Sequence, residues 1–185
     1  MDVPNLPQLF REKAEAVQVV VRDAADLAEA CRYAMEIARR QGGTAIAAPG
    51  WDPEVLSLLQ DQCGQARIEV LTANLRGQAD RLHTGFTRAD WGIADTGTIV
   101  LDSSSEDLRL ATMLSEIHIA VLPQSRLWAT SFDLEEELNR LAQSPPRYLS
   151  FITGASRTAD IERVLTLGVQ GPLELHLMLL KDCRP

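Results

Sequence analysis

The first part of the chain alternates between short apolar runs and stretches whose apolar residues recur at helical spacing. Residues 17–21 form a β-branched run that predicts a strand, and Asp23 is placed to cap the helix that follows. The apolar positions of this helix lie mostly three or four residues apart, before a stop at Gly42 and Gly43. They are Leu27, Ala30, Cys31, Ala34, Ile37 and Ala38. The pattern predicts a strand followed by an amphipathic helix.

The same unit then repeats along the chain. Residues 44–48 predict a second strand, and Pro49-Gly50-Trp51 predicts a turn after it. Asp52 followed by Pro53 predicts the start of a helix that ends at Gly64. Residues 67–71 predict a third strand. Strands that alternate with helices imply a mainly parallel sheet with helices on both faces, which is an α/β fold.

Residues 72–88 break this rhythm, because they are polar, contain glycine and have no clear periodicity. A long irregular segment beside a sheet is typical of a lid or a binding loop, and a disordered excursion is the alternative.

The remainder of the chain returns to regular elements. We expect strands at 98–101, 117–122, 126–130, 148–153 and 173–180, and helices at 106–115, 133–141 and 159–165. The Ser144-Pro145-Pro146 segment is too short to be a domain linker. The sequence therefore predicts a single domain over residues 1–185, with residues 1–16 as an N-terminal lead-in segment.

Composition and charge narrow the choice of partner and compartment. The 185 residues carry a formal net charge of −8, which disfavours nucleic acid and anionic membranes as main partners. The start of the chain lacks the pattern of a secretory signal, and no apolar run is long enough for a membrane span. Cys31, Cys63 and Cys183 are odd in number and widely separated, as in reduced proteins. We expect a cytoplasmic protein.

The segment 154–160 has the most features of a binding site. It joins a predicted strand to a predicted helix, so backbone N–H groups and the helix N-terminus would favour an anion. Ser156 and Thr158 offer hydroxyl groups around it, Gly154 permits the turn, and Arg157 offers a fork for carboxylate or phosphate. The alternative is a helix start that is only capped, with Thr158 as the N-cap.

A second candidate is the glycine-bracketed turn after Trp91. Asp95, Thr96, Gly97 and Thr98 could face a pocket as ligand-binding residues. The alternative is a hairpin, in which these residues supply turn chemistry and Trp91 anchors the core.

The histidines and cysteines have no metal-site spacing, so we expect no metal in this chain and no iron–sulfur cluster. His118 and His176 fall in predicted strands and are expected to be hydrogen-bonded within the fold. His83, in the polar segment, is the histidine placed to reach a substrate.

Four blocks of the second half together resemble the lactate-utilisation protein C family, the LUD domain. They are residues 91–98, Arg109 with 117–121, residues 154–162, and residues 167–172. Ala155, Gln170 and Ser115 stand where that family usually has proline, histidine and proline. The resemblance implies an α/β fold of the NagB/RpiA/CoA-transferase-like, three-layer kind.

The resemblance also implies a function in bacterial growth on L-lactate. The chain would be one subunit of an iron–sulfur system that oxidises lactate to pyruvate, with the clusters in partner subunits and none in this chain. It would bind a small anion rather than be the redox catalyst. The alternatives are a stand-alone enzyme for a sugar phosphate or an acyl-CoA, with Asp95 or Glu116 as base or nucleophile, and a non-catalytic scaffold.

Overall fold

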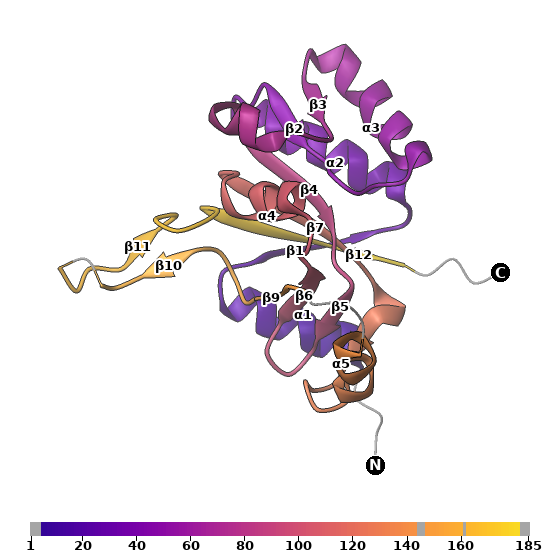
Figure 1. Cartoon of the computed structure of the whole chain (residues 1–185), viewed down its shortest axis with the longest axis vertical. Coiled ribbons are helices and arrows are strands. Elements are labelled where there is room, and N and C mark those ends of the chain that lie inside the picture. The colour runs from indigo at the N-terminus through magenta and orange to yellow at the C-terminus, as the bar shows by residue number, and fades with distance from the viewer. Residues whose placement is uncertain (1–4, 144–146, 161, 182–185) are drawn as a thin grey trace.

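The computed structural model describes residues 5–143, 147–160 and 162–181, and its centre is a six-stranded parallel sheet (Figure 1). The strands follow the order β1-β12-β7-β4-β2-β3 across this sheet. Their bounds are β1 Val20–Ala24, β2 Ala45–Ala47, β3 Glu69–Leu71, β4 Thr84–Arg88, β7 Ile117–Pro123 and β12 Glu174–Leu180. The predicted mainly parallel α/β architecture is confirmed.

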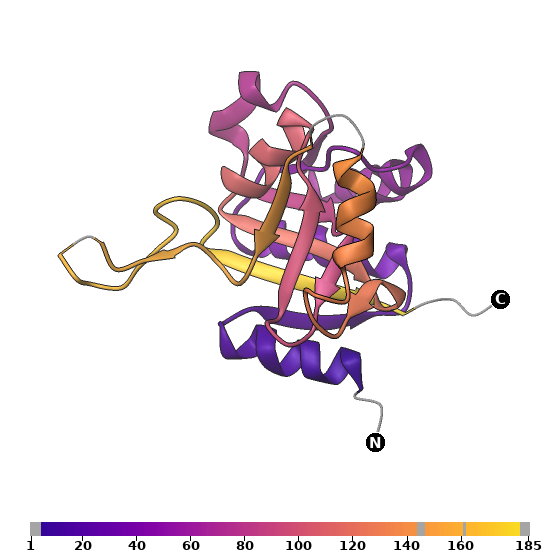
Figure 2. The same cartoon turned by 60° about the horizontal axis from the view of Figure 1, so that its bottom comes forward.

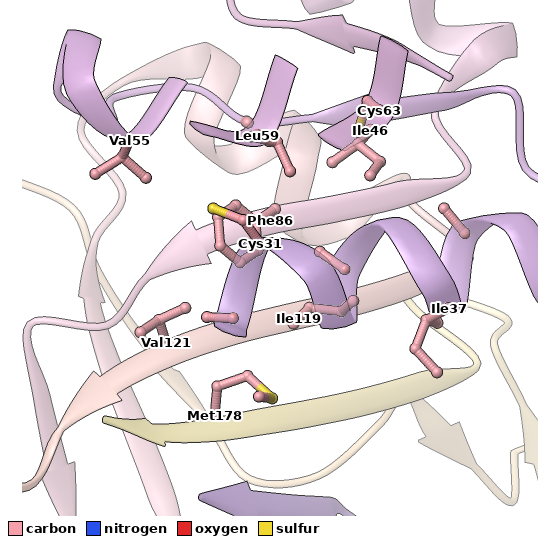
Figure 3. Close-up of a cluster of buried hydrophobic side chains, with 14 of the residues drawn as sticks. Cys31, Ile37, Ile46, Val55, Leu59, Cys63, Phe86, Ile119, Val121 and Met178 are labelled. Atoms are coloured by element: carbon pink, nitrogen blue, oxygen red, sulfur yellow. The ribbon is translucent and has the colours of Figure 1, made fainter. Parts of the chain in front are cut away.

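Helices cover both faces of this sheet, as the pattern predicted. Helices α2 (Leu27–Arg40) and α3 (Pro53–Ala66) pack on one face around Phe86, Ile119 and Met178 (Figure 3). The opposite face is covered by α1 (Leu6–Ala16), by α4 (Glu106–Met113) and by the 3-10 segment η1 (Leu75–Arg81). The three layers are therefore helices, sheet and helices.

A second sheet lies on the α1 side of the first one (Figure 2). It has the order β8-β5-β6-β9, with bounds β5 Trp91–Ile93, β6 Thr98–Asp102, β8 Leu127–Trp128 and β9 Leu149–Ile152. Its outer face packs against α5 (Glu135–Ala142) through Trp91, Val100 and Leu138. The sequence predicted most of these strands but not that they form a separate sheet.

The N-terminal region differs from the expectation in two ways. The predicted lead-in contains helix α1, whose Phe10 and Ala14 are fully buried. The first strand begins at Val20 instead of residue 17, and the helix cap is Asp26, whose carboxylate accepts from the Glu29 amide at 2.8 Å. Asp23 lies within β1 and pairs with Arg11 at 2.8 Å. The predicted cap at Asp23 is therefore wrong.

The expectation of an irregular loop over residues 72–88 is also wrong. This segment forms η1 and then β4, a central strand whose residues 84–87 are buried. Its pattern was hidden because β4 contains only one large apolar side chain, Phe86, beside two threonines and a glycine. A Cβ on Gly85 would lie 2.2 Å from the Ala111 carbonyl oxygen of α4, so glycine allows that helix to approach.

The predicted helix at 159–165 is wrong as well, and Ile161 within it lies outside the described residues. In its place, β10 (Arg157–Thr158) and β11 (Thr166–Leu167) pair antiparallel. Both views show this hairpin extending away from the rest of the protein (Figures 1 and 2). We call residues 156–173 the arm.

Some of the residues named in the sequence analysis lie outside the part of the chain that the structure describes. Ser144-Pro145-Pro146 and Cys183 lie outside the described residues. Within the described part of the chain, no helix is long and apolar enough to cross a membrane.

Candidate functional site at the carboxyl edge of the sheet

Adjacent strands β2 and β4 send the chain to opposite faces of the main sheet. After β2 the chain enters α3, which packs with α2, whereas after β4 it enters the second sheet on the other face. A crevice forms at the carboxyl ends of such strands because the two connections diverge. In open α/β sheets this is where ligands commonly bind.

The structure has a cavity of about 470 Å³ at this place, which we call the crevice. It is lined by Pro49, Gly50 and Trp51 after β2, by Arg88 and Asp90 after β4, and by Asp102, Ser104, Ser105 and Leu108 where β6 leads into α4. Three separate parts of the chain therefore contribute to one cavity.

Trp51 and Arg88 form the side of the crevice next to the main sheet. The Trp51 indole stacks on Phe86 at 4.9 Å between ring centroids and donates from Nε1 to the Phe86 carbonyl at 2.9 Å. Arg88 is exposed, and no carboxylate of the described residues forms an ion pair with it. Its guanidinium is therefore available to an anionic ligand.

Two carboxyl groups whose pKa values shift in opposite directions lie on the other side of the crevice. Burial raises the pKa of Asp90 above its ordinary value, although Asp90 accepts a hydrogen bond from the Asp102 amide at 2.7 Å. Burial also acts to raise the pKa of Asp102, but hydrogen bonds from Ser104 and Arg147 outweigh it and lower the pKa. Neighbouring carboxyl groups whose pKa values diverge are common in ligand-binding and catalytic sites.

The turn between β6 and α4 forms the third side. Ser105 caps α4, and its Oγ accepts from the Leu108 amide at 3.5 Å. Arg109 donates to the carbonyl oxygens of Ser103 at 2.6 Å and Ser104 at 2.9 Å, which holds the turn in place. The α4 N-terminus adds a partial positive charge on this side.

The two predicted loops lie elsewhere, but they do lie together. Thr98 Oγ1 is 2.8 Å from Thr96 Oγ1 and 2.7 Å from Thr153 Oγ1, so the turn at 95–98 adjoins the start of the 154–160 segment. Both loops pack against the end of α1: a Cβ on Gly97 would lie 2.4 Å from the Ala14 nitrogen, and one on Gly154 would lie 3.0 Å from the Val17 carbonyl. The hairpin alternative for this turn is the observed structure, with Trp91 buried.

Some side chains of these loops are exposed to solvent, and others are hydrogen-bonded within the arm. Asp95 and Arg157 are exposed. Ser156 Oγ accepts from the Gln170 amide at 3.2 Å and Thr158 Oγ1 accepts from the Asp160 amide at 3.2 Å, so both hydroxyl groups stabilise the arm. Because the described residues after 158 form no helix, they provide no helix N-terminus of the kind expected here. Anion binding by these residues stays a prediction.

Glu116 is separated from Asp95. It lies at the amino end of β7, where its side chain lines a cavity of about 520 Å³ together with Gln170 at the base of the arm. The structure therefore does not combine the two candidate catalytic carboxylates in one site.

His118 and His176 are hydrogen-bonded within the fold, as expected. His118 is 1% exposed and lies 2.8 Å from Thr87 Oγ1, and His176 is 4% exposed between Tyr33 and Glu174. His83 packs over Gly43 at the amino end of β4, on the opposite edge from the crevice. Among the residues that the structure describes, no group of three or more metal-ligating side chains could hold a metal ion.

Sequence reasoning missed the crevice because it missed β4. Once 84–88 is a strand beside β2, Arg88 and Asp90 fall at its carboxyl end, next to the predicted turn at Gly50 and Trp51. The available signal was Arg-Ala-Asp directly after a Phe-Thr pair, which is too short for periodicity to detect.

The comparisons with known proteins agree with the fold. A lactate utilization protein C of Halalkalibacterium halodurans is 34% identical over 108 residues, which cover 57% of this chain and 47% of that protein. That of Geobacillus kaustophilus is 29% identical over 174 residues, covering 86% of this chain and 70% of that protein. The chain thus spans about half the length of several relatives that it matches.

A solved structure and a family profile extend the match to nearly the whole chain. The crystal structure of a DUF162 family protein from Deinococcus radiodurans covers 95% of this chain and 96% of its own, with a TM-score of 0.65 at 20% identity, which shows the shared fold. The profile of the LUD domain matches residues 7–180. The chain therefore belongs to the LUD domain family, as the four sequence blocks predicted.

Proposed function

We propose that this chain is a subunit of a bacterial system that oxidises lactate to pyruvate, and that it binds a small carboxylate in the crevice. The role is supported by relatives named lactate utilization protein C. The observation that carries the binding site is Arg88, which forms no ion pair with any carboxylate of the described residues and lies at the carboxyl edge of the sheet, in a cavity that Asp90 also lines.

The chemistry of a 2-hydroxy acid fits this arrangement. Arg88 would bind the carboxylate through two parallel hydrogen bonds, and the Asp90 carboxyl group would accept from the hydroxyl group. The Ser105 hydroxyl and the start of α4 would add donors on the opposite side. Trp51 supplies an apolar wall for the methyl group.

Calorimetric titration with L-lactate and pyruvate tests this proposal. Arg88→Gln should weaken binding by at least about tenfold, because it removes a charged bidentate contact. Arg157→Gln, which makes the same change in the predicted loop at 154–160, is the matched variant and should leave binding unchanged. Weakening by Arg157→Gln alone would place the anion at that loop instead, and no binding of either acid would overturn the ligand part.

The arm is the surface we propose for contact with partner subunits. Seven of the twelve large apolar side chains that are exposed in the described part of the chain lie on the arm or at its base. They are Met113, Leu114, Val164, Leu165, Leu167, Val169 and Leu173. Apolar side chains gathered in this way are typical of protein–protein contacts.

Co-purification with iron–sulfur subunits of a lactate-oxidising system tests the partner. Leu165→Asp with Leu167→Asp should abolish co-purification without changing thermal stability, because both side chains are exposed. Leu58→Asp, at an exposed apolar position on α3, is the control. Equal loss with both sets of changes, or no loss with either, would contradict this surface. We expect any iron–sulfur clusters to reside in the partners.

The size of the crevice favours a second candidate function. A volume of about 470 Å³ is within the range of sites for ligands much larger than lactate. A stand-alone enzyme for a sugar phosphate or an acyl-CoA is therefore the alternative. Binding of such a compound with loss in Arg88→Gln, and no binding of lactate or pyruvate, would favour it.

A further inference from the structure

A second polar pocket lies at the β1 edge of the main sheet, far along the sheet order from the crevice. Helix α2 covers the neighbouring strands, and β1 is the outermost strand of this sheet (Figure 1). A cavity of about 430 Å³ lies between α2, β1 and the first residues of β12, and we call it the edge pocket. It is lined by Val20, Arg22, Tyr33, Ile37, Arg40, Gln41, Glu174 and His176.

A chain of hydrogen bonds runs through the wall of this pocket. The Tyr33 hydroxyl is 2.7 Å from His176 Nδ1, and His176 Nε2 is 2.8 Å from Glu174 Oε2. Gln41 Nε2 donates to both Glu174 oxygens, at 3.2 and 3.1 Å. The Arg22 guanidinium lies close to the Tyr33 hydroxyl on the β1 side of the pocket.

The donor and the acceptor of each of these hydrogen bonds can be assigned by starting from Glu174. Hydrogen bonds from His176 and Gln41 lower the pKa of Glu174, so its carboxylate only accepts, and His176 carries a proton on Nε2. Neutral His176 then has a bare Nδ1, which accepts the Tyr33 proton. The hydroxyl proton of Tyr33 therefore points inward and is not available to the pocket.

Protonation of His176 would reverse this last bond. With a proton on each ring nitrogen, His176 donates to Glu174 and to Tyr33, and the Tyr33 O–H is released to donate into the pocket. The same event adds one positive charge beside Arg22 and Arg40, which form no ion pair with a described carboxylate. Burial lowers the pKa of His176, so in the empty pocket the neutral form prevails at neutral pH.

We propose that the edge pocket binds a tetrahedral oxyanion, such as the phosphate group of a small phosphate ester, and that binding is coupled to proton uptake at His176. Two guanidinium groups, one from β1 and one from α2, and one hydroxyl from α2 match several oxygens around one centre better than the two oxygens of a carboxylate. This site is independent of the function proposed for the crevice.

The charged groups around His176 set the sign of the coupling. An anion favours the protonated form, and linkage then requires that affinity increase as the pH falls. The surrounding groups are Glu174 on β12, Arg22 on β1, and Tyr33 and Arg40 on α2, while uncharged Ile119 pairs with His176 on β7. The adjoining cavity beside Arg22 and Tyr33 is lined by one further cation and three carboxylates: Arg32, Asp23, Glu29 and Glu36.

Calorimetry with sulfate tests the proposal, because sulfate keeps its charge of −2 between pH 5 and pH 8 while phosphate does not. The full chain should bind sulfate at least about tenfold more tightly at pH 5.5 than at pH 8. Titrations in two buffers of different ionisation enthalpy should show proton uptake at the intermediate pH. Acetate, the planar comparator, should bind more weakly.

Two matched variants separate a built site from general attraction to arginines. Arg40→Gln should weaken sulfate binding at least about tenfold, whereas Arg39→Gln, which is adjacent on α2 but does not line the pocket, should change it less than about twofold. Tyr33→Phe should reduce the affinity and its dependence on pH, provided that its thermal unfolding matches that of the unmodified chain. Equal effects of the two arginine variants, pH-independent binding, or no sulfate binding would each overturn the proposal.

Discussion

At the scale of single residues, the ionised form of Asp90 favours binding of the proposed ligand but lowers the stability of the fold. Its pKa is raised by burial, so the folded chain holds this proton more strongly than the unfolded chain, and the ionised group lowers stability near neutral pH. We expect Asp90→Asn to leave the free energy of unfolding at pH 7 unchanged or higher, because the amide oxygen can still accept from Asp102.

The same variant should bind L-lactate at least about tenfold more weakly, since it loses a charged acceptor. Urea unfolding and calorimetry measure the two effects. A clear loss of stability at pH 7 would contradict the inference that burial of the ionised Asp90 carboxylate lowers the free energy of unfolding. Unchanged binding would remove Asp90 from the ligand contacts.

His118 makes stability depend on pH. Burial lowers its pKa to about 4, so the folded chain resists a proton that the unfolded chain accepts near pH 6.5. The contribution of neutral His118 to the free energy of unfolding is fully present above pH 6.5 and is lost as the pH falls towards 4. Over this range the free energy of unfolding decreases by up to about 1.4 kcal/mol per pH unit.

Asparagine at this position does not titrate, which provides the test. His118→Asn should be less stable than the unmodified chain at pH 7.5, because the bond to Thr87 is disturbed. Between pH 6.5 and 4 its unfolding free energy should fall less steeply, although His176 still contributes to the decline. Identical slopes by urea unfolding would show that His118 is not responsible.

At the scale of elements, the contact between α1 and the turn of the β5–β6 hairpin depends on one glycine. Gly97 has φ of 64°, and a Cβ there would lie 2.4 Å from the Ala14 backbone nitrogen. Gly97→Ala should therefore destabilise the protein by about 2 kcal/mol or more, through both strain and displacement of α1.

Gly42→Ala is the matched control, because Gly42 also has positive φ but no atom lies within 4 Å of an added Cβ. It should cost about 1 kcal/mol, the backbone contribution alone. Equal losses for the two variants in urea unfolding would mean that the close approach of α1 does not matter.

Elements differ in how far local sequence specified them. Helices α2 and α3 were predicted because their apolar residues recur on one face and Asp-Pro or glycine marks their ends. Strand β4 was not predicted, because it is buried by its neighbours β2 and β7 and by α4, which lie elsewhere in the sequence. The arm was mistaken for a helix because its local charge pattern resembles a helix start, while Ser156 and Gly168 join its two ends through bonds that no periodicity reveals.

At the scale of the whole molecule, the two described cysteines report on global unfolding. Cys31 and Cys63 are fully buried between α2, α3 and the main sheet, and burial raises the pKa of each thiol to about 11 (Figure 3). We expect them to resist alkylation at pH 8 in the folded protein and to react at the rate of unfolding.

Labelling with iodoacetamide followed by mass spectrometry of the peptides checks this expectation. Both sites should become labelled with the same rate constant in intermediate urea, because α2 and α3 share one core. Fast labelling of either cysteine without denaturant, or two different rates in urea, would indicate that this layer opens locally.

Local patterns along the chain were sufficient to predict the fold class and the family. Hydrophobic spacing and helix ends are local properties, and the four blocks that resemble the LUD domain are linear strings, so both can be recognised without a partner strand or a distant residue. The sequence also located the turn at Gly50 and Trp51, which proved to be one side of the crevice.

The positions of the candidate sites, in contrast, depend on how distant parts of the chain pack together. The crevice exists because β2 and β4 are neighbours in the sheet, although 36 residues of the chain lie between Ala47 at the end of β2 and Thr84 at the start of β4. The edge pocket likewise joins Tyr33 to His176 across 143 positions of the chain. Such contacts depend on strand order, and strand order is set by the summed burial of all layers, which no local pattern contains.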